Sequence, residues 1–167
     1  DSPDNMTGRV FLPALRYLTD RGRHGWINAV WPRSENEGLF RSLAPEQEDE
    51  VLASMVICPN INHNAEQILK AIAAKSPEKV IDFFGKRLAH EKGLQSSRGY
   101  DEVPYEFHDL RETLQKIPEQ LVAKVREWFA SDNELFAYRG GRMIAAVFPE
   151  PEDQLLKPLH ELAGTGK

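Results

Sequence analysis

Cysteine is nearly absent from this 167-residue sequence, because Cys58 is the only one. A single thiol excludes an internal disulfide and a zinc site built from several cysteines. The N-terminus also lacks the basic stretch and the apolar run of a secretion signal. Both absences fit a reducing compartment, so we expect a cytoplasmic protein.

Long apolar runs are lacking as well. The longest uncharged, apolar-rich stretch covers residues 51–61, and Pro59 and Asn60 interrupt it. A helix that spans a membrane needs about 20 apolar residues. The sequence therefore predicts a soluble chain without a membrane partner.

The sequence also has no excess of basic residues. It contains 21 Lys and Arg against 26 Asp and Glu, which gives a net charge of −5. Non-specific binders of nucleic acid or of membrane surfaces need a basic excess. The first 41 residues differ, with six Arg, no Lys and a net charge of +1. Because guanidinium groups make planar, bidentate contacts, Arg23 and Arg33 are candidate anion-binding residues, and a salt-bridged surface is the alternative.

Signals for β-strands are weak. No stretch alternates polar and apolar residues for long, and the hairpin pairs Asn-Gly and Asp-Gly do not occur. Apolar residues recur instead at helical spacing, as in Val80, Ile81, Phe84 and Leu88. The pattern predicts an all-α fold of nine or ten short helices.

A Pro-Glu pair occurs four times and predicts where helices begin. Proline suits the first turn of a helix, where its missing N–H costs nothing. A glutamate in that turn interacts favourably with the positive end of the helix dipole. Ser76 is a candidate N-cap before one of the pairs. The predicted helix starts are Pro45, Pro77, Pro118 and Pro151.

The four prolines are separated by 32, 41 and 33 residues. Periods of this length are typical of stacked helical repeats. The two middle units also share apolar residues 3, 4, 7 and 11 positions after Pro77 and after Pro118. We expect the large aromatic side chains of these units to fill the space between repeats, namely Phe83, Phe84, Trp128 and Phe129.

Each unit consists of a helix, a short turn and a helix that starts with proline. Over roughly residues 39–162, this pattern resembles the HEAT and armadillo class of α-solenoid repeats. The resemblance implies stacked helix pairs with a shared core and a long surface used for binding. An irregular multi-helix bundle is the alternative architecture.

The length corresponds to one domain. Residues 1–43 lack the Pro-Glu register, so we expect atypical N-terminal helices there, helical repeats over residues 44–162 and a tail at residues 163–167. Two interpretations of the ends stay open. The chain is either a fragment of a larger multidomain protein or a chain that starts at Met6.

The 41-residue spacing places extra residues between Leu88 and Glu106, and residues 93–105 form the longest stretch without a helical pattern. Loops of this length are often functional. Tyrosine and arginine are enriched in binding hot spots. A second interpretation is a loop that its aromatic residues hold over the helix ends. The candidate partner-binding residues are Arg98, Tyr100, Tyr105 and Phe107.

The sequence Arg139-Gly140-Gly141-Arg142 predicts an interruption of a helix, because two glycines free the backbone to bend. Arg139 and Arg142 are candidate anion-binding residues. A loop or kink between two helices, without a ligand, is the alternative.

Motifs for catalysis and for cofactors are missing. No two of the five histidines lie three or four residues apart, as paired metal ligands on one helix face would. A Gly-x-Ser-x-Gly turn does not occur, and the C-terminal Gly-Thr-Gly-Lys lacks the rest of a phosphate-binding loop. We therefore predict no metal site, no cofactor and no enzymatic activity.

The expected function follows from the expected architecture, since helical solenoids mostly serve as binding surfaces. We expect a non-catalytic binding or scaffold module that recognises a protein or peptide partner, as an arm of a larger protein if the chain is a fragment. The alternative is a helical repeat that binds nucleic acid through the Arg-rich N-terminal segment.

Overall fold

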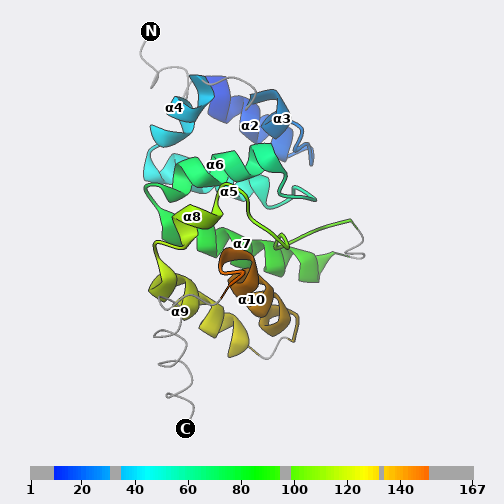
Figure 1. Cartoon of the computed structure of the whole chain (residues 1–167). Coiled ribbons are helices and arrows are strands. Elements are labelled where there is room, and N and C mark those ends of the chain that lie inside the picture. Colours follow the sequence, from blue (N-terminus) through cyan, green and yellow to red (C-terminus); the bar gives the residue numbers. More distant parts are fainter. Residues whose placement is uncertain (1–9, 31–34, 95–98, 132–133, 151–167) are drawn as a thin grey trace.

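The computed structural model describes residues 10–30, 35–94, 99–131 and 134–150. Within these ranges the chain forms nine α-helices and no β-strand, which confirms the all-α prediction (Figure 1). The helices are α2 (Leu12–Thr19), α3 (Trp26–Val30), α4 (Glu35–Arg41), α5 (Pro45–Met55), α6 (His63–Ala73), α7 (Pro77–Gly93), α8 (Arg111–Leu114), α9 (Pro118–Phe129) and α10 (Glu134–Val147).

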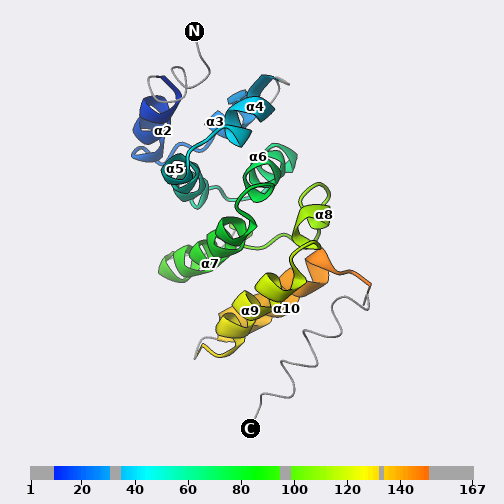
Figure 2. The same ribbon diagram turned by 90° about the vertical axis from the view of Figure 1, so that its left-hand side faces the viewer.

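The helices pack in two rows. In one row, α2 contacts α5, α5 contacts α7, and α7 contacts α9. In the other row, α3 and α4 contact α6, α6 contacts α8, and α8 contacts α10. The rows lie side by side in Figure 2, and contacts of α6 with α5 and α7 and of α9 with α10 join them. Each helix therefore packs against a helix that comes earlier or later in its own row.

Three of the predicted helix starts are confirmed, because α5, α7 and α9 begin at Pro45, Pro77 and Pro118. The fourth, Pro151, lies outside the described residues. Ser76 occupies the N-cap position of α7, as predicted, but its side chain makes no capping hydrogen bond. The Ser76 hydroxyl donates instead to the buried carboxylate of Glu48 on α5, at 2.9 Å.

The predicted interruption at residues 139–142 is wrong, because α10 continues through both glycines. The reason is packing against α9. A Cβ atom at Gly140 would lie 3.0 Å from Val125 Cγ1 and 3.3 Å from the Phe129 ring. The glycine thus permits a close approach of two helices.

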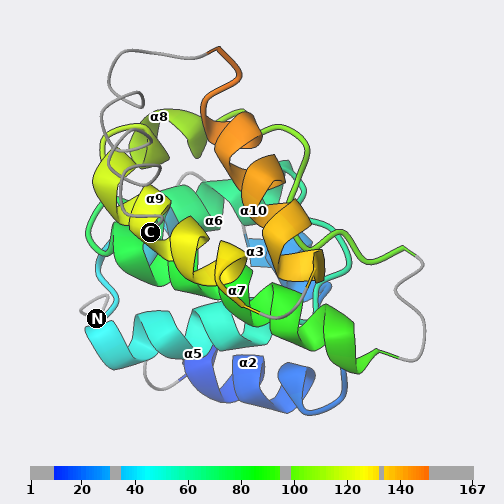
Figure 3. The same ribbon diagram turned by 90° about the horizontal axis from the view of Figure 1, so that it is seen from below.

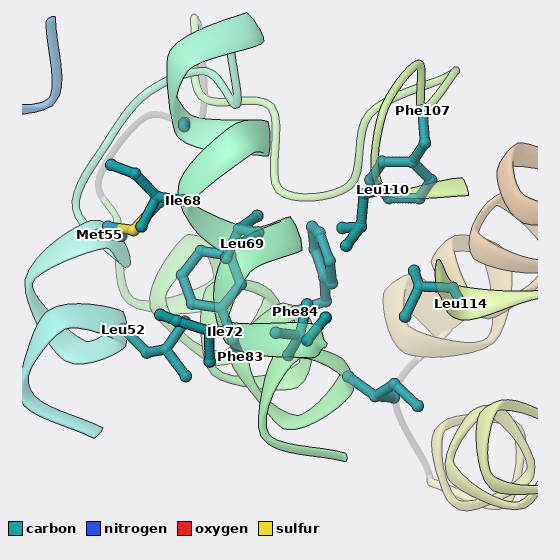
Figure 4. Packing of buried hydrophobic residues seen from close by; sticks show 14 of the residues in the cluster. Leu52, Met55, Ile68, Leu69, Ile72, Phe83, Phe84, Phe107, Leu110 and Leu114 are labelled. Atoms are coloured by element: carbon teal, nitrogen blue, oxygen red, sulfur yellow. The ribbon is translucent and has the colours of Figure 1, made fainter. Parts of the chain in front are cut away.

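The core contains buried residues from all the described helices, and Figure 4 shows a part of it. Phe83 and Phe84 on α7 contact each other edge to face, with ring centroids 5.2 Å apart, and Phe84 contacts Phe107 in the same way at 5.4 Å. All three rings are fully buried. Leucine, isoleucine and methionine side chains from α5, α6 and α8 surround them, including Leu52, Met55, Ile68, Leu69, Ile72 and Leu114.

One of the four predicted fillers does not take this role. Phe83, Phe84 and Trp128 are buried, but 54% of Phe129 is exposed. Leu88 has the same offset in α7 and is fully buried. The shared pattern therefore holds for the first three offsets and fails at the fourth.

Candidate functional site

Arg87 on α7 holds residues 101 and 102 of the segment that connects α7 to α8. Its side chain is fully buried and donates to backbone carbonyls of two loops. Burial lowers the pKa of the Arg87 guanidinium. The acceptors are the carbonyl oxygens of Met55 (3.3 Å), Val56 (3.2 Å), Cys58 (2.7 Å), Pro59 (3.4 Å), Asp101 and Glu102 (2.9 Å).

Glu66 on α6 fixes the other end of the same segment. Its carboxylate is 3% exposed and accepts from the backbone N–H groups of Asp109 (2.7 Å) and Leu110 (2.9 Å). Between the two ends, Val103 and Phe107 are fully buried. Residues 99–110 are thus held by buried contacts, in which Phe107 takes part as an aromatic residue while charged side chains of α6 and α7 fix the ends.

A charged cluster lies where this segment meets α7 and α10. Glu102 contacts the guanidinium groups of Arg139 and Arg142, and Arg142 also pairs with Asp101. Glu91 on α7 lies 3.9 Å from Arg139. Glu91 and Glu102 are 8% and 1% exposed. Burial raises the pKa of the Glu91 carboxyl, and the neighbouring Glu102 raises it further.

These ion pairs bear directly on the predicted anion sites. Arg139 and Arg142 already have carboxylate partners from this chain, so their positive charge is balanced within the fold. Arg23 is exposed at the N-terminal end of the described chain. Arg33 lies outside the described residues. Of the three candidate arginines that the structure describes, Arg139 and Arg142 lie together and Arg23 lies apart from them.

Two exposed tyrosines cover the charged cluster. Tyr105 is 71% exposed, and the Arg142 guanidinium lies 3.4 Å from its ring centre. Tyr138 is 64% exposed, and Arg139 lies 5.1 Å from its ring centre. Cation–π contacts of this kind hold an aromatic ring in place. We call these four residues the tyrosine–arginine surface.

The other predicted partner-binding residues have different environments. Phe107 is fully buried against Phe84, so it is a core residue and not part of an exposed surface. Tyr100 is half-buried, its hydroxyl donates to the carbonyl of Val56, and burial raises its pKa to about 12. Arg98 lies outside the described residues. Of the four, Tyr105 is the residue that the structure places at the surface of the described chain.

Neither Arg87 nor Glu66, the two residues that fix the segment, was predicted from the sequence. A signal was present for Arg87, which lies three residues after Phe84 on the apolar face of α7. A charge on such a face needs internal hydrogen bonds, since burial without them is very unfavourable. No local signal distinguishes Glu66, because its partners lie more than 40 residues away, at a separation of 43 and 44.

In the described part of the chain, no three His, Cys, Asp or Glu side chains are grouped so that they could hold a metal ion. The same residues include no helix of the length and apolar character needed to cross a membrane. Cys58 is buried, and burial raises the pKa of its thiol to about 12. The thiol is therefore protonated at neutral pH and unreactive as a nucleophile.

Comparisons of this chain with protein-family models, with curated proteins and with solved structures give no match.

Proposed function

We propose that this chain is a non-catalytic helical-repeat module, with the stacked helix pairs of a HEAT-like α-solenoid, that recognises a protein or peptide partner. The tyrosine–arginine surface is the proposed contact. A rigid aromatic surface of this type suits a partner that buries the tyrosine rings. The partner class is the one expected from the sequence. The proposed contact differs, because three of its four residues lie on α10 and not in the segment between α7 and α8.

The spacing of side-chain contacts supports the repeat arrangement. Many polar contacts between neighbouring helix pairs join residues 28 to 36 positions apart, a range that includes the proline spacings of 32 and 33. Around the longer 41-residue unit, the separations rise to between 41 and 44. An irregular bundle does not require such a period. The contacts are Lys75 to Leu43 (32), Arg16 to Glu50 (34), Lys79 to Pro45 (34) and Asn64 to Asn28 (36).

The observation that carries the binding proposal is an exposed ring on a fixed backbone. Tyr105 lies between the contacts made by Arg87 and those made by Glu66, both of them buried. A surface that is ordered before binding loses little conformational entropy on association. Tyrosine and arginine are also the residue types that dominate binding energy at protein interfaces.

A protein partner is favoured over nucleic acid by the state of the arginines. Arg16, Arg139 and Arg142 pair with carboxylates of this chain. Neutralised guanidinium groups contribute little to the counterion release that drives nucleic-acid binding. The affinity for the partner should accordingly depend only weakly on salt, whereas a nucleic-acid complex would weaken steeply.

The test measures binding to purified partners. Partners would be isolated by affinity purification from the source cells, identified by mass spectrometry and measured again as pure proteins by calorimetry. Tyr105→Ala and Tyr138→Ala should each weaken the affinity by about tenfold or more, the effect of losing one hot-spot residue.

Tyr17→Ala is the matched control. Tyr17 is 57% exposed and lies against Arg21 at 3.6 Å, so it reproduces the tyrosine–arginine contact at the other end of the molecule. Its replacement should leave the affinity unchanged. Equal affinities for wild type, Tyr105→Ala and Tyr138→Ala, with folded proteins by circular dichroism, would contradict the proposal.

A further inference from the structure

A shallow, open groove lies between α7 and α9, and the start of α10 contributes one residue to its lining. Its volume is about 370 Å³, within the range of sites that hold an organic group. Figure 3 shows the three helices side by side from below. The residues from α7 follow helical spacing, so one face of this helix forms a wall of the groove. The lining is Asp82, Gly85, Lys86 and Ala89 from α7, Lys124, Glu127 and Trp128 from α9, and Phe136 from α10.

The floor of the groove is apolar and carries no long side chain from α7. A Cβ atom at Gly85 would lie 3.3 Å from Trp128 Nε1, so the missing side chain leaves the indole ring directly against the α7 backbone. Ala89 adds one exposed methyl group, and Phe136 is half-buried. A large apolar side chain placed here would lie over Gly85, next to the phenyl ring and above the nearly buried indole.

At the rim of the groove, two lysines differ in their ion pairing with the described residues. Lys124 lies between Asp82 at 2.8 Å and Glu127 at 2.9 Å, so these three residues carry one excess negative charge. Lys86 is exposed, and no ion-pair partner for it is found among the residues that the structure describes. A ligand that complements this rim has a carboxylate close to Lys86. It has no further acidic group close to Glu127.

We propose that the α7–α9 groove docks a peptide segment of the partner that presents a large apolar side chain next to a carboxylate. The apolar side chain lies over Gly85, Ala89 and Trp128, and the carboxylate pairs with Lys86. This inference rests on the proposed function, that the chain binds a protein or peptide partner, and adds a second contact with a defined chemistry. A second copy of this chain is a poorer occupant, because its net charge of −5 repels an identical chain.

Peptide-sized probes test the chemistry directly. N-acetyl-phenylalanyl-glutamic acid amide and its glutamine counterpart would be titrated at millimolar concentration while the indole N–H signal of Trp128 is followed by NMR. The acidic probe should bind about two- to fivefold more tightly, which is the range of one exposed ion pair. Lys86→Met should abolish the difference between the two probes.

Filling the groove tests its location. Ala89→Trp should prevent the shift of the Trp128 signal, whereas Ala123→Trp, at an exposed alanine of α9 outside the groove lining, should leave it intact. The proposal is overturned if the signal does not move, if both probes bind equally, or if Ala89→Trp binds like wild type. A shift that depends on protein concentration alone would assign the groove to a second copy and overturn it as well.

The two proposals fail separately. Tyr105→Ala leaves the groove unchanged, so probe binding should survive in that variant. If the full partner loses affinity in Tyr105→Ala but not in Ala89→Trp, the proposed function stands and the groove inference falls. If the probes bind as expected while no partner depends on Tyr105 or Tyr138, the groove inference stands without the tyrosine–arginine surface.

Discussion

Helices α7 and α9 begin with the same Pro-Glu pair and carry apolar residues at the same offsets, yet their environments differ. Helix α7 has neighbours on both sides in its row, α5 and α9. Among the described helices of that row, α9 has a neighbour on one side, α7. Ten positions after the proline, α7 has the buried Arg87 and α9 has Trp128. A repeated sequence pattern therefore determines where a helix forms and which face it turns to the core. The helices packed against it determine which of its other side chains are buried.

The largest expected effect is at Arg87, which has no counterpart in α9. Arg87→Met should destabilise the fold by about 3–5 kcal/mol, because buried carbonyls of two loops lose their donor. Arg126→Met, at an exposed arginine of α9, is the matched control and should change stability by less than about 0.5 kcal/mol. Urea unfolding followed by circular dichroism measures both. Equal effects would show that α7 and α9 are not distinguished by this residue.

The next largest effect on stability is expected at the apolar residue eleven positions after the proline. Leu88→Ala should cost about 2–5 kcal/mol, because Leu88 is fully buried and its removal leaves a cavity. Phe129→Ala should cost less, about 1 kcal/mol, since more than half of the ring is already in solvent. The same urea experiment compares them. A larger cost for Phe129→Ala than for Leu88→Ala would reverse the comparison between the two helices.

Helix α7 has 17 residues and α9 has 12. The additional last turn of α7 contains Glu91, and we expect this residue to make the stability of the fold depend on pH. The pKa of Glu91 is raised in the folded state. Its protonated form therefore contributes stability that is complete below the unfolded pKa of about 4.3 and is lost as the pH rises through the folded pKa. Glu91→Gln removes this loss and should be more stable than wild type near pH 7 by about 1 kcal/mol.

Thermal melts between pH 4 and pH 8 measure this dependence. The gain of Glu91→Gln over wild type should grow as the pH rises through that range. Glu48→Gln is the contrast within the same fold, because Glu48 is fully buried with Lys75 at 3.0 Å and Lys79 at 3.4 Å. Removing that charge should destabilise the protein. A gain for Glu91→Gln that is independent of pH would exclude the titration of Glu91 as its cause.

The smallest effects distinguish two helix glycines. Gly85→Ala on α7 brings a Cβ to 3.3 Å from Trp128, so the gain in helix propensity is offset by displacement of the indole. Gly141→Ala on α10 meets only the edge of Phe129 at 4.0 Å and should stabilise the fold by about 0.5–1 kcal/mol. Denaturation midpoints measure both. A stabilisation of Gly85→Ala equal to that of Gly141→Ala would mean that the indole yields without cost.

The elements of the fold were largely predictable from local sequence. Pro45, Pro77 and Pro118 were placed correctly at helix starts, because the lack of an N–H at proline acts within one turn. The glycines of α10 were misinterpreted for the same local reason. Their conformational freedom suggested a break, but a contact 3.0 Å from Val125 on another helix explains Gly140 instead.

The candidate site was predictable only in part. The tyrosine at position 105 was selected by residue type and is exposed, whereas Phe107 was selected by the same reasoning and is buried. The two residues differ in which side chains pack against them in the fold. The residue type alone does not predict this. Arg139 and Arg142 were selected as anion ligands, and their carboxylate partners Asp101 and Glu102 lie about 40 positions earlier in the chain.

The sequence by itself determined an all-α chain, the residues at which three helices start and the inner faces of α7 and α9. These features depend on backbone geometry and on apolar spacing within a single helix. Only the tertiary structure decided that Arg87 is buried, that Phe129 is exposed and that residues 99–110 are held in place. The physical reason is that burial and ion pairing depend on partners 14 to 44 residues away, which no local pattern specifies.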